Sequence, residues 1–307
     1  MAIAAQDYRR YLDPAVLARI TGLDLRARLM VQGFISGLHR SPAHGFSVEF
    51  AEHRKYCQGD DLRFMDWKVF GRTDKHYIKE YEQESNLRLL LAVDCSESMT
   101  YKSVESPLSK REYAMSVAAA LAYLAVQQSD AVGLAVFDTR LHYTGRPSNH
   151  PGRWKTVVTE LAQTPSRGRT AFRAVLDELA DTLHQRHLII LISDLLGPEE
   201  EILSGLKHLR HERHELVVFH VLDRAELTFP FSRPVQFMGL EDMEPLTAEP
   251  RVMRQHYLRQ LHAFVDRLRG GCHEQQIDYE VFDTSASLGA ALSSYLSARA
   301  ASARRWR

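Results

Sequence analysis

Leu87-Arg-Leu-Leu-Leu-Ala-Val-Asp94 is the stretch that decides the fold. Apart from Arg88 it is an unbroken apolar run, which is typical of a strand buried on both faces of a parallel sheet. It ends in an acid, and a second such run, residues 187–193, is followed by Asp194. Ligands of open parallel sheets bind at the carboxyl ends of the strands, where the strand order reverses. If these two strands are neighbours, both aspartates face one crevice.

The pattern continues on both sides of this strand. Further strands are expected at 131–137, 141–144, 215–222 and 277–282, and helices at 110–128, 154–162, 171–185, 198–211, 251–269 and 288–300. This alternation predicts an α/β fold, with a doubly wound, mostly parallel, Rossmann-like sheet covered by helices on both faces. Residues 224–250 break the alternation with three prolines before Leu246, so an inserted hairpin or lid is expected there.

The first 86 residues differ from the rest. Residues 17–38 carry a broad apolar stripe at helical spacing, whereas residues 46–82 are dense in charges and aromatic rings and have little helical periodicity. We therefore expect a helix followed by short strands and turns. The chain divides into an N-terminal segment at 1–86, an α/β domain at 87–300 and a basic tail at 301–307.

The composition excludes several classes of protein. Lys+Arg and Asp+Glu number 39 each, so the formal charge of +0 indicates no bulk attraction to nucleic acid or to an anionic membrane. Three widely spaced cysteines without a CxxC pair argue against a disulfide scaffold or a cysteine-built zinc site and favour a reducing compartment. The sequence has no signal-peptide pattern, and its longest apolar run, 114–126, is too short to cross a bilayer. We expect a cytoplasmic protein without a membrane span.

The residues after the first strand carry the candidate chemistry. In an extended chain alternate residues point the same way, so Asp94, Ser96 and Ser98 present one carboxylate and two hydroxyls together. Thr170, just before a helix, supplies another hydroxyl, and Asp194 a second carboxylate. These hard oxygen donors suit Mg²⁺, Mn²⁺ or Ca²⁺ better than zinc or copper. The alternative is that Asp94 and Ser96 only cap the turn that follows the strand.

The same pattern resembles the metal-ion-dependent adhesion site (MIDAS) of von Willebrand factor A domains, over roughly residues 87–300. The resemblance implies a von Willebrand A-like fold. It also implies a divalent cation, held partly through water, whose coordination is completed by an acidic residue of a protein partner. The positions that match are Asp94, Ser96, Ser98, Thr170 and Asp194.

An upstream segment carries a second resemblance. Residues 54–67, Arg-Lys-Tyr-Cys-Gln-Gly-Asp-Asp-Leu-Arg-Phe-Met-Asp-Trp, with Arg72 and Glu80 after them, resemble the signature of the bacterial "domain of unknown function 58" family. Its members join such a segment to a von Willebrand A-like domain and are commonly encoded beside MoxR-type AAA+ ATPases. The resemblance implies an adaptor that works with such an ATPase in assembling or remodelling other proteins. The departures at Met65, Gly71 and Ala171-Phe172 touch no proposed ligand.

The charges of this upstream segment have two interpretations. So many charges are too costly to bury unpaired, and arginine favours bidentate pairing with carboxylates, so they predict an ion-pair network that fixes the segment. The same side chains are also suited to a docking surface for a partner. The residues concerned are Arg54, Tyr56, Gly59, Asp60, Arg63, Asp66, Trp67 and Arg72.

Three functions compete. The first is a non-enzymatic, metal-assisted interaction module with no catalytic residue. The second is a Mg²⁺-dependent phosphoryl-transfer enzyme, which would also place an aspartate after the first strand. Haloacid-dehalogenase-type phosphatases have a second aspartate two residues on, where this chain has Ser96, and a hydroxyl is a poor general acid near neutral pH. The third is a structural module whose site stays empty. We favour the first, and expect Ser96→Ala and Asp194→Ala to weaken partner binding without disturbing the fold.

Overall fold

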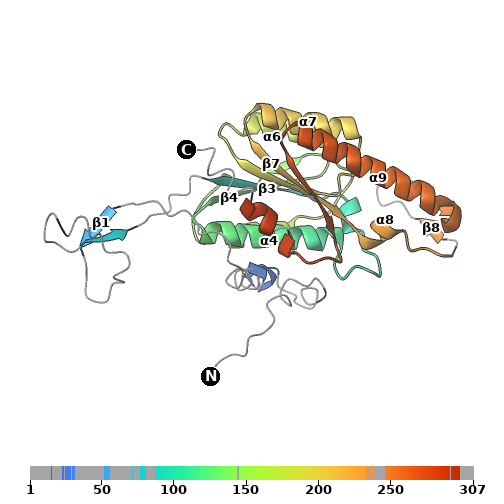
Figure 1. Cartoon of the computed structure of the whole chain (residues 1–307), viewed down its shortest axis with the longest axis horizontal. Helices are drawn as coiled ribbons and strands as arrows, with labels where there is room; N and C mark the ends of the chain where they lie inside the picture. The colour runs from blue at the N-terminus through green and yellow to red at the C-terminus, as the bar shows by residue number, and fades with distance from the viewer. Residues whose placement is uncertain are drawn as a thin grey trace, which may run out of the picture.

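The fold is described from a computed structural model, which covers residues 15, 23, 25–28, 30–31, 52–55, 71, 77–80, 87–143, 145–233, 235–237, 246–290 and 292–297. Its centre is a six-stranded sheet with helices on both faces (Figure 1). Only the edge strand β5 pairs antiparallel, with β4. The doubly wound, mostly parallel α/β fold expected from the sequence is therefore confirmed. From one edge to the other the strands are β10 (Asp278–Asp283), β7 (Glu215–Leu222), β6 (Leu188–Ser193), β3 (Arg88–Asp94), β4 (Ala131–Phe137) and β5 (Leu141–Tyr143).

The strand order reverses beside β3. The chain runs outward from β3 through β4 and β5, then returns to the other side of β3 and runs outward through β6, β7 and β10. The parallel register pairs Val93 of β3 with Ile192 of β6. Asp94 and Asp194 therefore leave the sheet at neighbouring points, which is the switch point where doubly wound sheets bind their ligands. The two strands are therefore neighbours, which is the condition under which both aspartates face the same place.

Two hydrophobic cores cover the sheet. On one face, alternate residues of β3 such as Leu89 and Leu91 pack with α4 (Lys110–Gln127) and α5 (Arg153–Gln163). On the other face, Leu90 and Ala92 pack with α6 (Phe172–Thr182), α7 (Glu199–His211) and α9 (Pro250–Glu274). Figure 1 shows α4 on the opposite side of the strands from α6 and α7. This burial of both strand faces explains the continuous apolar runs in the sequence.

The elements around the carboxyl edge of the sheet position the site. A short 3-10 helix, η3 (Ser98–Thr100), follows β3, and a loop leads to the capping box of Ser109 and Glu112 that starts α4. After β7 the chain forms α8 (Arg224–Thr228) and then an antiparallel hairpin of β8 (Val235–Phe237) and β9 (Leu246–Ala248). This hairpin lies in the 224–250 stretch where the prolines predicted one.

Helix α9 is longer than the sequence suggested. The pair Gly270-Gly271 is a signal for a helix end, but α9 continues through it to Glu274. A Cβ at position 271 would lie 2.7 Å from the methyl carbons of Leu203 on α7. The glycine therefore serves close packing of α7 against α9 rather than the end of the helix.

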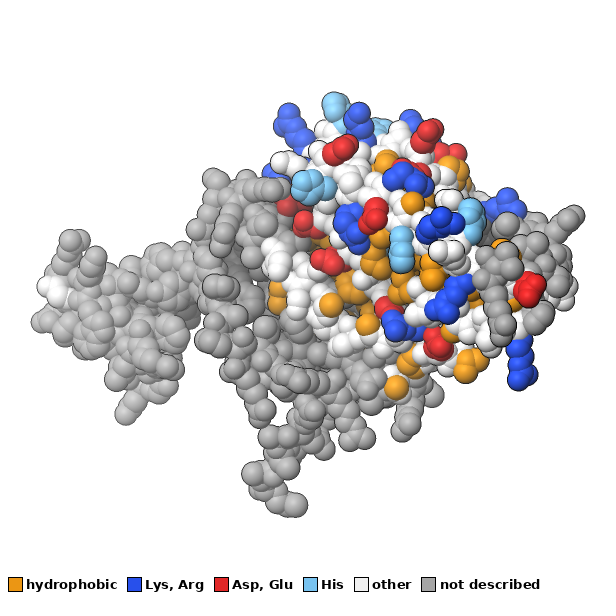
Figure 2. All heavy atoms as spheres, turned by 45° about the vertical axis from the view of Figure 1, so that its right-hand side comes forward, with side chains coloured by type: hydrophobic (Ala, Val, Ile, Leu, Met, Phe, Trp, Pro, Cys, Tyr) orange, Lys and Arg blue, Asp and Glu red, His pale blue; other side chains and the backbone are white. Residues whose placement is uncertain are grey.

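The described part of the N-terminal segment has a helical stretch and a pair of short strands. β1 (Glu52–Lys55) and β2 (Tyr77–Glu80) pair antiparallel in a separate two-stranded sheet. The helical residues Met30 and Val31 are buried in the core on the α4 side of the main sheet. No helix in the described ranges is long and apolar enough to cross a membrane. On the face shown in Figure 2, positive and negative side chains are interleaved over the part that is coloured by residue type.

Candidate functional site

Asp94, the last residue of β3, lies at the centre of the site and is fully buried. Its Oδ1 accepts from the backbone N–H of Ser96 at 2.8 Å, and its Oδ2 accepts from the Ser193 hydroxyl at 2.5 Å. The Thr170 hydroxyl lies 3.1 Å from both carboxylate oxygens. All of these donors are neutral. The buried carboxylate of Asp94 thus has hydrogen bonds but, within the described residues, no cationic partner.

The hydroxyls of the site form a short chain between the two aspartates. The Oγ atoms of Ser96 and Ser98 are 3.0 Å apart, and the Ser98 hydroxyl hydrogen-bonds the carboxylate of Asp194. Ser96 and Ser98 are both buried. The structure therefore brings together the five positions that the sequence singled out, 94, 96, 98, 170 and 194.

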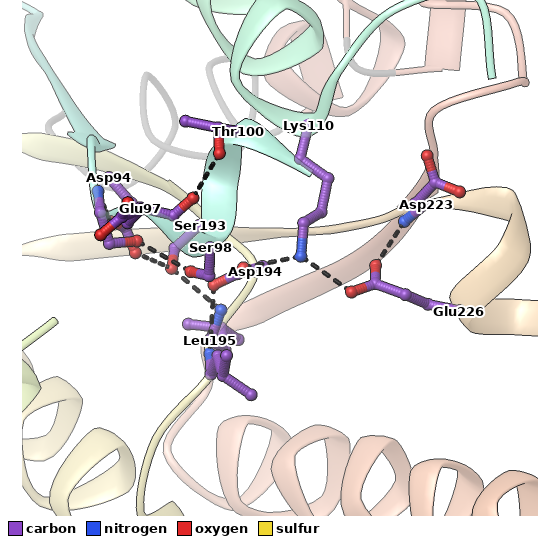
Figure 3. Close-up of polar contacts among 12 residues, drawn as sticks. Asp94, Glu97, Ser98, Thr100, Lys110, Ser193, Asp194, Leu195, Asp223 and Glu226 are labelled. Carbon is purple, nitrogen blue, oxygen red and sulfur yellow. Dashed lines mark hydrogen bonds and ion pairs between the residues drawn. The ribbon is translucent and has the colours of Figure 1, made fainter. Parts of the chain in front are cut away.

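Asp194, which follows β6, is also buried but has a cation beside it. Its Oδ2 lies 2.8 Å from the Lys110 Nζ, and its Oδ1 accepts from the backbone N–H of Leu196 at 3.2 Å. The ammonium of Lys110 also donates to Glu226 Oε1 at 2.8 Å. Figure 3 shows Lys110 pointing from the start of α4 to a position between the carboxylates of Asp194 and Glu226. One ammonium therefore links three elements, α4, the end of β6 and α8.

The two aspartates titrate in opposite directions. Burial raises the pKa of Asp94 to about 7, repulsion from Asp194 adds to the rise, and the hydrogen bonds from Ser193 and Ser96 only partly oppose it. Burial also acts to raise the pKa of Asp194, but the ion pair and hydrogen bond with Lys110 outweigh it and hold that pKa below its ordinary value. Burial acts to lower the pKa of Lys110, yet the two carboxylates raise it overall, so the ammonium stays charged.

Local sequence signals place Lys110 and Glu226. Lys110 is the first residue of α4, immediately after the N-cap Ser109, so it starts at the carboxyl edge of the sheet. Glu226 belongs to the capping box of α8, where its Oε2 accepts from the backbone N–H of Asp223 at 2.7 Å. Capping boxes are recognisable in sequence. The two capping boxes therefore predict that Lys110 and Glu226 lie at the carboxyl edge of the sheet, but they do not predict that the two side chains are in contact.

The backbone around Asp194 is held in an unusual conformation. Leu195 has a φ of 50°, a left-handed conformation that a branched side chain rarely adopts, and its side chain is buried in the core beneath α6 and α7. The His220 Nε2–H donates to the carbonyl oxygen of Asp194 at 2.9 Å, and Tyr279 hydrogen-bonds the Nδ1 of that ring. Burial lowers the pKa of His220 to about 4, so the ring is neutral. Together, core packing and this neutral histidine fix Asp194.

Capping of the turns does occur, and it is shared by five strands. The aspartates at the ends of β3, β4, β6, β7 and β10 each accept at Oδ1 from the backbone N–H two residues on: Asp94, Asp138, Asp194, Asp223 and Asp283. The capping interpretation therefore describes one oxygen of every strand-end aspartate. It does not account for the arrangement around the second oxygen of Asp94, where two hydroxyls converge.

The donor set fits a hard divalent cation. Two carboxylates and the hydroxyls of Ser96, Ser98, Thr170 and Ser193 are oxygen donors of the kind Mg²⁺, Mn²⁺ and Ca²⁺ prefer. Throughout the described ranges no three His, Cys, Asp or Glu side chains gather as a metal site would require. The fit therefore depends on hydroxyls rather than on imidazole or thiolate, which disfavours zinc and copper.

Sequence reasoning missed three residues of the site, Ser193, Lys110 and Glu226. Ser193 directly precedes Asp194 and lies on the buried strand β6, so its hydroxyl had no polar pattern around it to attract notice. For Arg54 of the upstream segment only the backbone, in β1, is described. The others lie outside the described residues: Tyr56, Gly59, Asp60, Arg63, Asp66, Trp67 and Arg72.

The fold and the strand-end site together define an α/β protein with a doubly wound, mostly parallel sheet and polar side chains gathered at its switch point. The family model described as "Protein of unknown function DUF58" matches residues 52–264, which is more than half of the chain, so the chain belongs to that family. The uncharacterized protein Rv1480 of Mycobacterium tuberculosis is 29% identical over 225 residues, covering 71% of this chain and 68% of the relative.

Two solved structures are among those that this chain matches over part of its length. BatB from Bacteroides thetaiotaomicron is 16% identical, with a TM-score of 0.45, over 70% of this chain and 99% of that one. The VWA domain of SpRpn10 is 10% identical, with a TM-score of 0.39, over 67% of this chain and 93% of that one.

Proposed function

We propose that this protein is a non-enzymatic interaction module that binds one divalent cation, Mg²⁺ or alternatively Mn²⁺ or Ca²⁺, and uses it to hold an acidic residue of a protein partner. The residues that would hold the cation are Asp94, Ser96, Ser98, Thr170 and Asp194. The observation that carries this proposal is the environment of Asp94, a fully buried carboxylate whose pKa is raised to about 7 among neutral donors. A cation beside it would remove the cost of burying its charge.

The charges of the buried cluster support one divalent ion. When all groups are ionised, Asp94, Asp194 and Glu226 carry negative charge and Lys110 alone carries positive charge. The cluster then has two negative charges in excess, which one divalent cation balances. Without a cation, Asp94 takes up a proton instead as the pH falls below about 7, because its pKa is raised to about that value.

The surface next to the site suits a protein partner. Leu196, two residues after Asp194, is 55% exposed, one of the large apolar side chains of the described part that faces solvent. An apolar side chain beside a charged site is common in protein interfaces, where it buries area while the ion fixes the register. A partner segment with an acidic residue for the cation and an apolar residue for Leu196 fits this surface.

For the identity of the partner we rely on the family resemblance. We propose a MoxR-type AAA+ ATPase, with this chain acting as its adaptor in assembling or remodelling other proteins. The free, buried cysteines Cys95 and Cys272 are compatible with action in the cytoplasm, where thiols stay reduced.

Titration calorimetry with Mg²⁺ and Mn²⁺ tests the cation site. The wild type should bind one ion, and Asp94→Asn should bind none. Asp138→Asn is the matched control, because Asp138 closes the same kind of turn after the adjacent strand β4 and contacts none of the five proposed ligands through its side chain. No heat in any of the three proteins would leave the structural module as the better description.

Affinity capture from a cell lysate, with Mg²⁺ or with a chelator, tests the partner. An AAA+ ATPase retained only with Mg²⁺, and lost with Asp94→Asn, is the expected result. Turnover of a generic phosphate ester that needs Mg²⁺ and is abolished by Asp94→Asn would instead favour the phosphoryl-transfer enzyme.

A further inference from the structure

Lys110 is the residue of the site whose presence the cation-binding proposal does not explain. Its side chain is 3% exposed, and its ammonium lies 2.8 Å from both Asp194 Oδ2 and Glu226 Oε1. Figure 3 shows the ammonium beside the carboxylate of Asp194, on the side away from Asp94. A site built only to bind a cation tightly would not contain a second, covalently attached cation.

The ammonium and a bound divalent ion draw on the same negative charge. Asp194 is a proposed ligand and at the same time the ion-pair partner of Lys110. Charges a few ångströms apart in a poorly solvated site interact strongly, so a divalent ion is repelled by the ammonium and finds Asp194 already neutralised. Lys110 cannot move into solvent easily, because it is buried and Glu226 holds it from the other side.

We propose that Lys110 is a resident counter-ion of Asp194 that keeps the affinity of the site for a free divalent cation low, so that the cation is retained firmly only when a carboxylate of the partner adds negative charge. This inference rests on the proposed function of the site and adds how that function is controlled. It makes loading of the site depend on the partner, as expected of an adaptor that must release as well as bind.

Glu226 opposes Lys110 in this arrangement. It adds a negative charge on the far side of the ammonium and shares its hydrogen bonds, which reduces the neutralisation of Asp194. Removing the charge of Lys110 and removing the charge of Glu226 should therefore change cation affinity in opposite directions. Simple damage to the site would lower affinity in both variants, so the two substitutions separate an electrostatic role from a structural one.

The test is titration calorimetry with MgCl₂ and MnCl₂ on five proteins: the wild type, Lys110→Met, Glu226→Gln, the double variant, and Lys102→Met. Lys102 is the matched control, an exposed lysine in the loop before α4 whose ammonium donates to the Pro107 carbonyl. We expect Lys110→Met to bind the cation about tenfold more tightly or better, from the strength of such charge interactions. Glu226→Gln should bind several-fold more weakly, and the double variant and Lys102→Met should bind like the wild type.

Lys110→Met leaves Asp194 without its counter-ion and is liable to unfold. If it does, the comparison of the double variant with Glu226→Gln decides, because it removes the ammonium from a background that has lost one carboxylate. Tighter binding in the double variant supports the proposal, and equal or weaker binding overturns it.

Acetate serves as a probe for the carboxylate of the partner. At constant ionic strength, acetate should tighten Mg²⁺ binding in the wild type and have a smaller effect in Lys110→Met. Equal effects in the two proteins would overturn the dependence on a partner.

The outcomes separate the two proposals. Cation binding in the wild type that Lys110→Met does not strengthen overturns the counter-ion role and leaves the cation site standing. Measurable binding in the wild type that becomes tighter in Lys110→Met supports both. Absence of binding in every variant overturns both.

Discussion

The two halves of the site are built from the same local parts and end in opposite electrostatic states. At the ends of β3 and β6, Asp94 and Asp194 are both buried, and each closes a turn with the backbone N–H two residues on. Yet the pKa of Asp94 is raised to about 7 and that of Asp194 is lowered. The difference comes from distant parts of the chain, since hydroxyls surround Asp94 whereas Lys110 pairs with Asp194. The charge of a strand-end aspartate is thus decided by its tertiary neighbours.

Removing the charge of Asp194 should have the largest effect on stability. Asp194→Asn breaks a buried ion pair and leaves Lys110 with Glu226 alone, so we expect a loss of about 2–4 kcal/mol in the free energy of unfolding. Urea unfolding at pH 7.5 in a chelator measures this loss. This revises the expectation that substitutions at position 194 leave the fold untouched, because the carboxylate lies inside the packed structure and holds a buried cation. If Asp194→Asn were as stable as the wild type, the ion pair with Lys110 would not be what distinguishes Asp194 from Asp94.

Removing the charge of Asp94 should increase the free energy of unfolding instead of lowering it. Without a cation, Asp94→Asn relieves a buried carboxylate that has no positive partner among the described residues, so we expect a gain of about 1–3 kcal/mol at pH 8. The same variant should lose all stabilisation by Mg²⁺. Thermal unfolding with and without Mg²⁺ measures both effects, and a variant that is less stable than the wild type in chelator would refute the inference that the ionised carboxylate of Asp94 destabilises the fold.

The pH dependence isolates this contribution. The folded-state pKa of Asp94, about 7, lies above the unfolded value of about 3.9, so folding favours the protonated form. Its contribution to stability is complete below pH ~4 and is lost as the pH rises through about 7. In chelator, the advantage of Asp94→Asn over the wild type should therefore grow between pH ~4 and ~7 and level off above that.

The quantity to measure is the difference in the free energy of unfolding between Asp94→Asn and the wild type. Buried histidines also make stability depend on pH in this range, but with the opposite sign. Burial lowers the pKa of His214 and of His220 to about 4, so their contributions rise with pH. They are common to both proteins and cancel. A constant difference from pH 4.5 to pH 8 would show that Asp94 does not titrate as described.

The hydroxyl of Ser193 should give the smallest effect. Ser193→Ala removes the 2.5 Å hydrogen bond to Asp94 Oδ2, which stabilises the ionised carboxylate, so the pKa of Asp94 should rise further. We expect a loss of about 0.5–1.5 kcal/mol at pH 8 and a smaller loss at pH 5, where Asp94 is protonated. Urea unfolding at both pH values measures these losses. Equal losses would show that the Ser193 hydroxyl stabilises the fold only through its second hydrogen bond, which it accepts from the Leu195 N–H.

Much of the fold could be predicted from the sequence because β3 and β6 are buried on both faces and therefore read as continuous apolar runs. The end of α9 could not, because Gly271 has a packing role against Leu203 that a local helix-end signal does not reveal. The site divides in the same way. Asp94, Ser96 and Ser98 are close in sequence, so their proximity was predictable, but the chain turns into η3 after Asp94 instead of staying extended as the sequence argument assumed.

The sequence by itself determined the order of strands and helices, the acids that end them and the five oxygen donors proposed as ligands, because burial and spacing are local properties of the chain. The tertiary structure alone decided which acid has a counter-ion. Lys110 and Asp194 are 84 residues apart, and Lys110 and Glu226 are 116 apart. Packing of α4 and α8 at the same edge of the sheet brings these charges to 2.8 Å, and electrostatic energy depends on distance in space rather than along the chain.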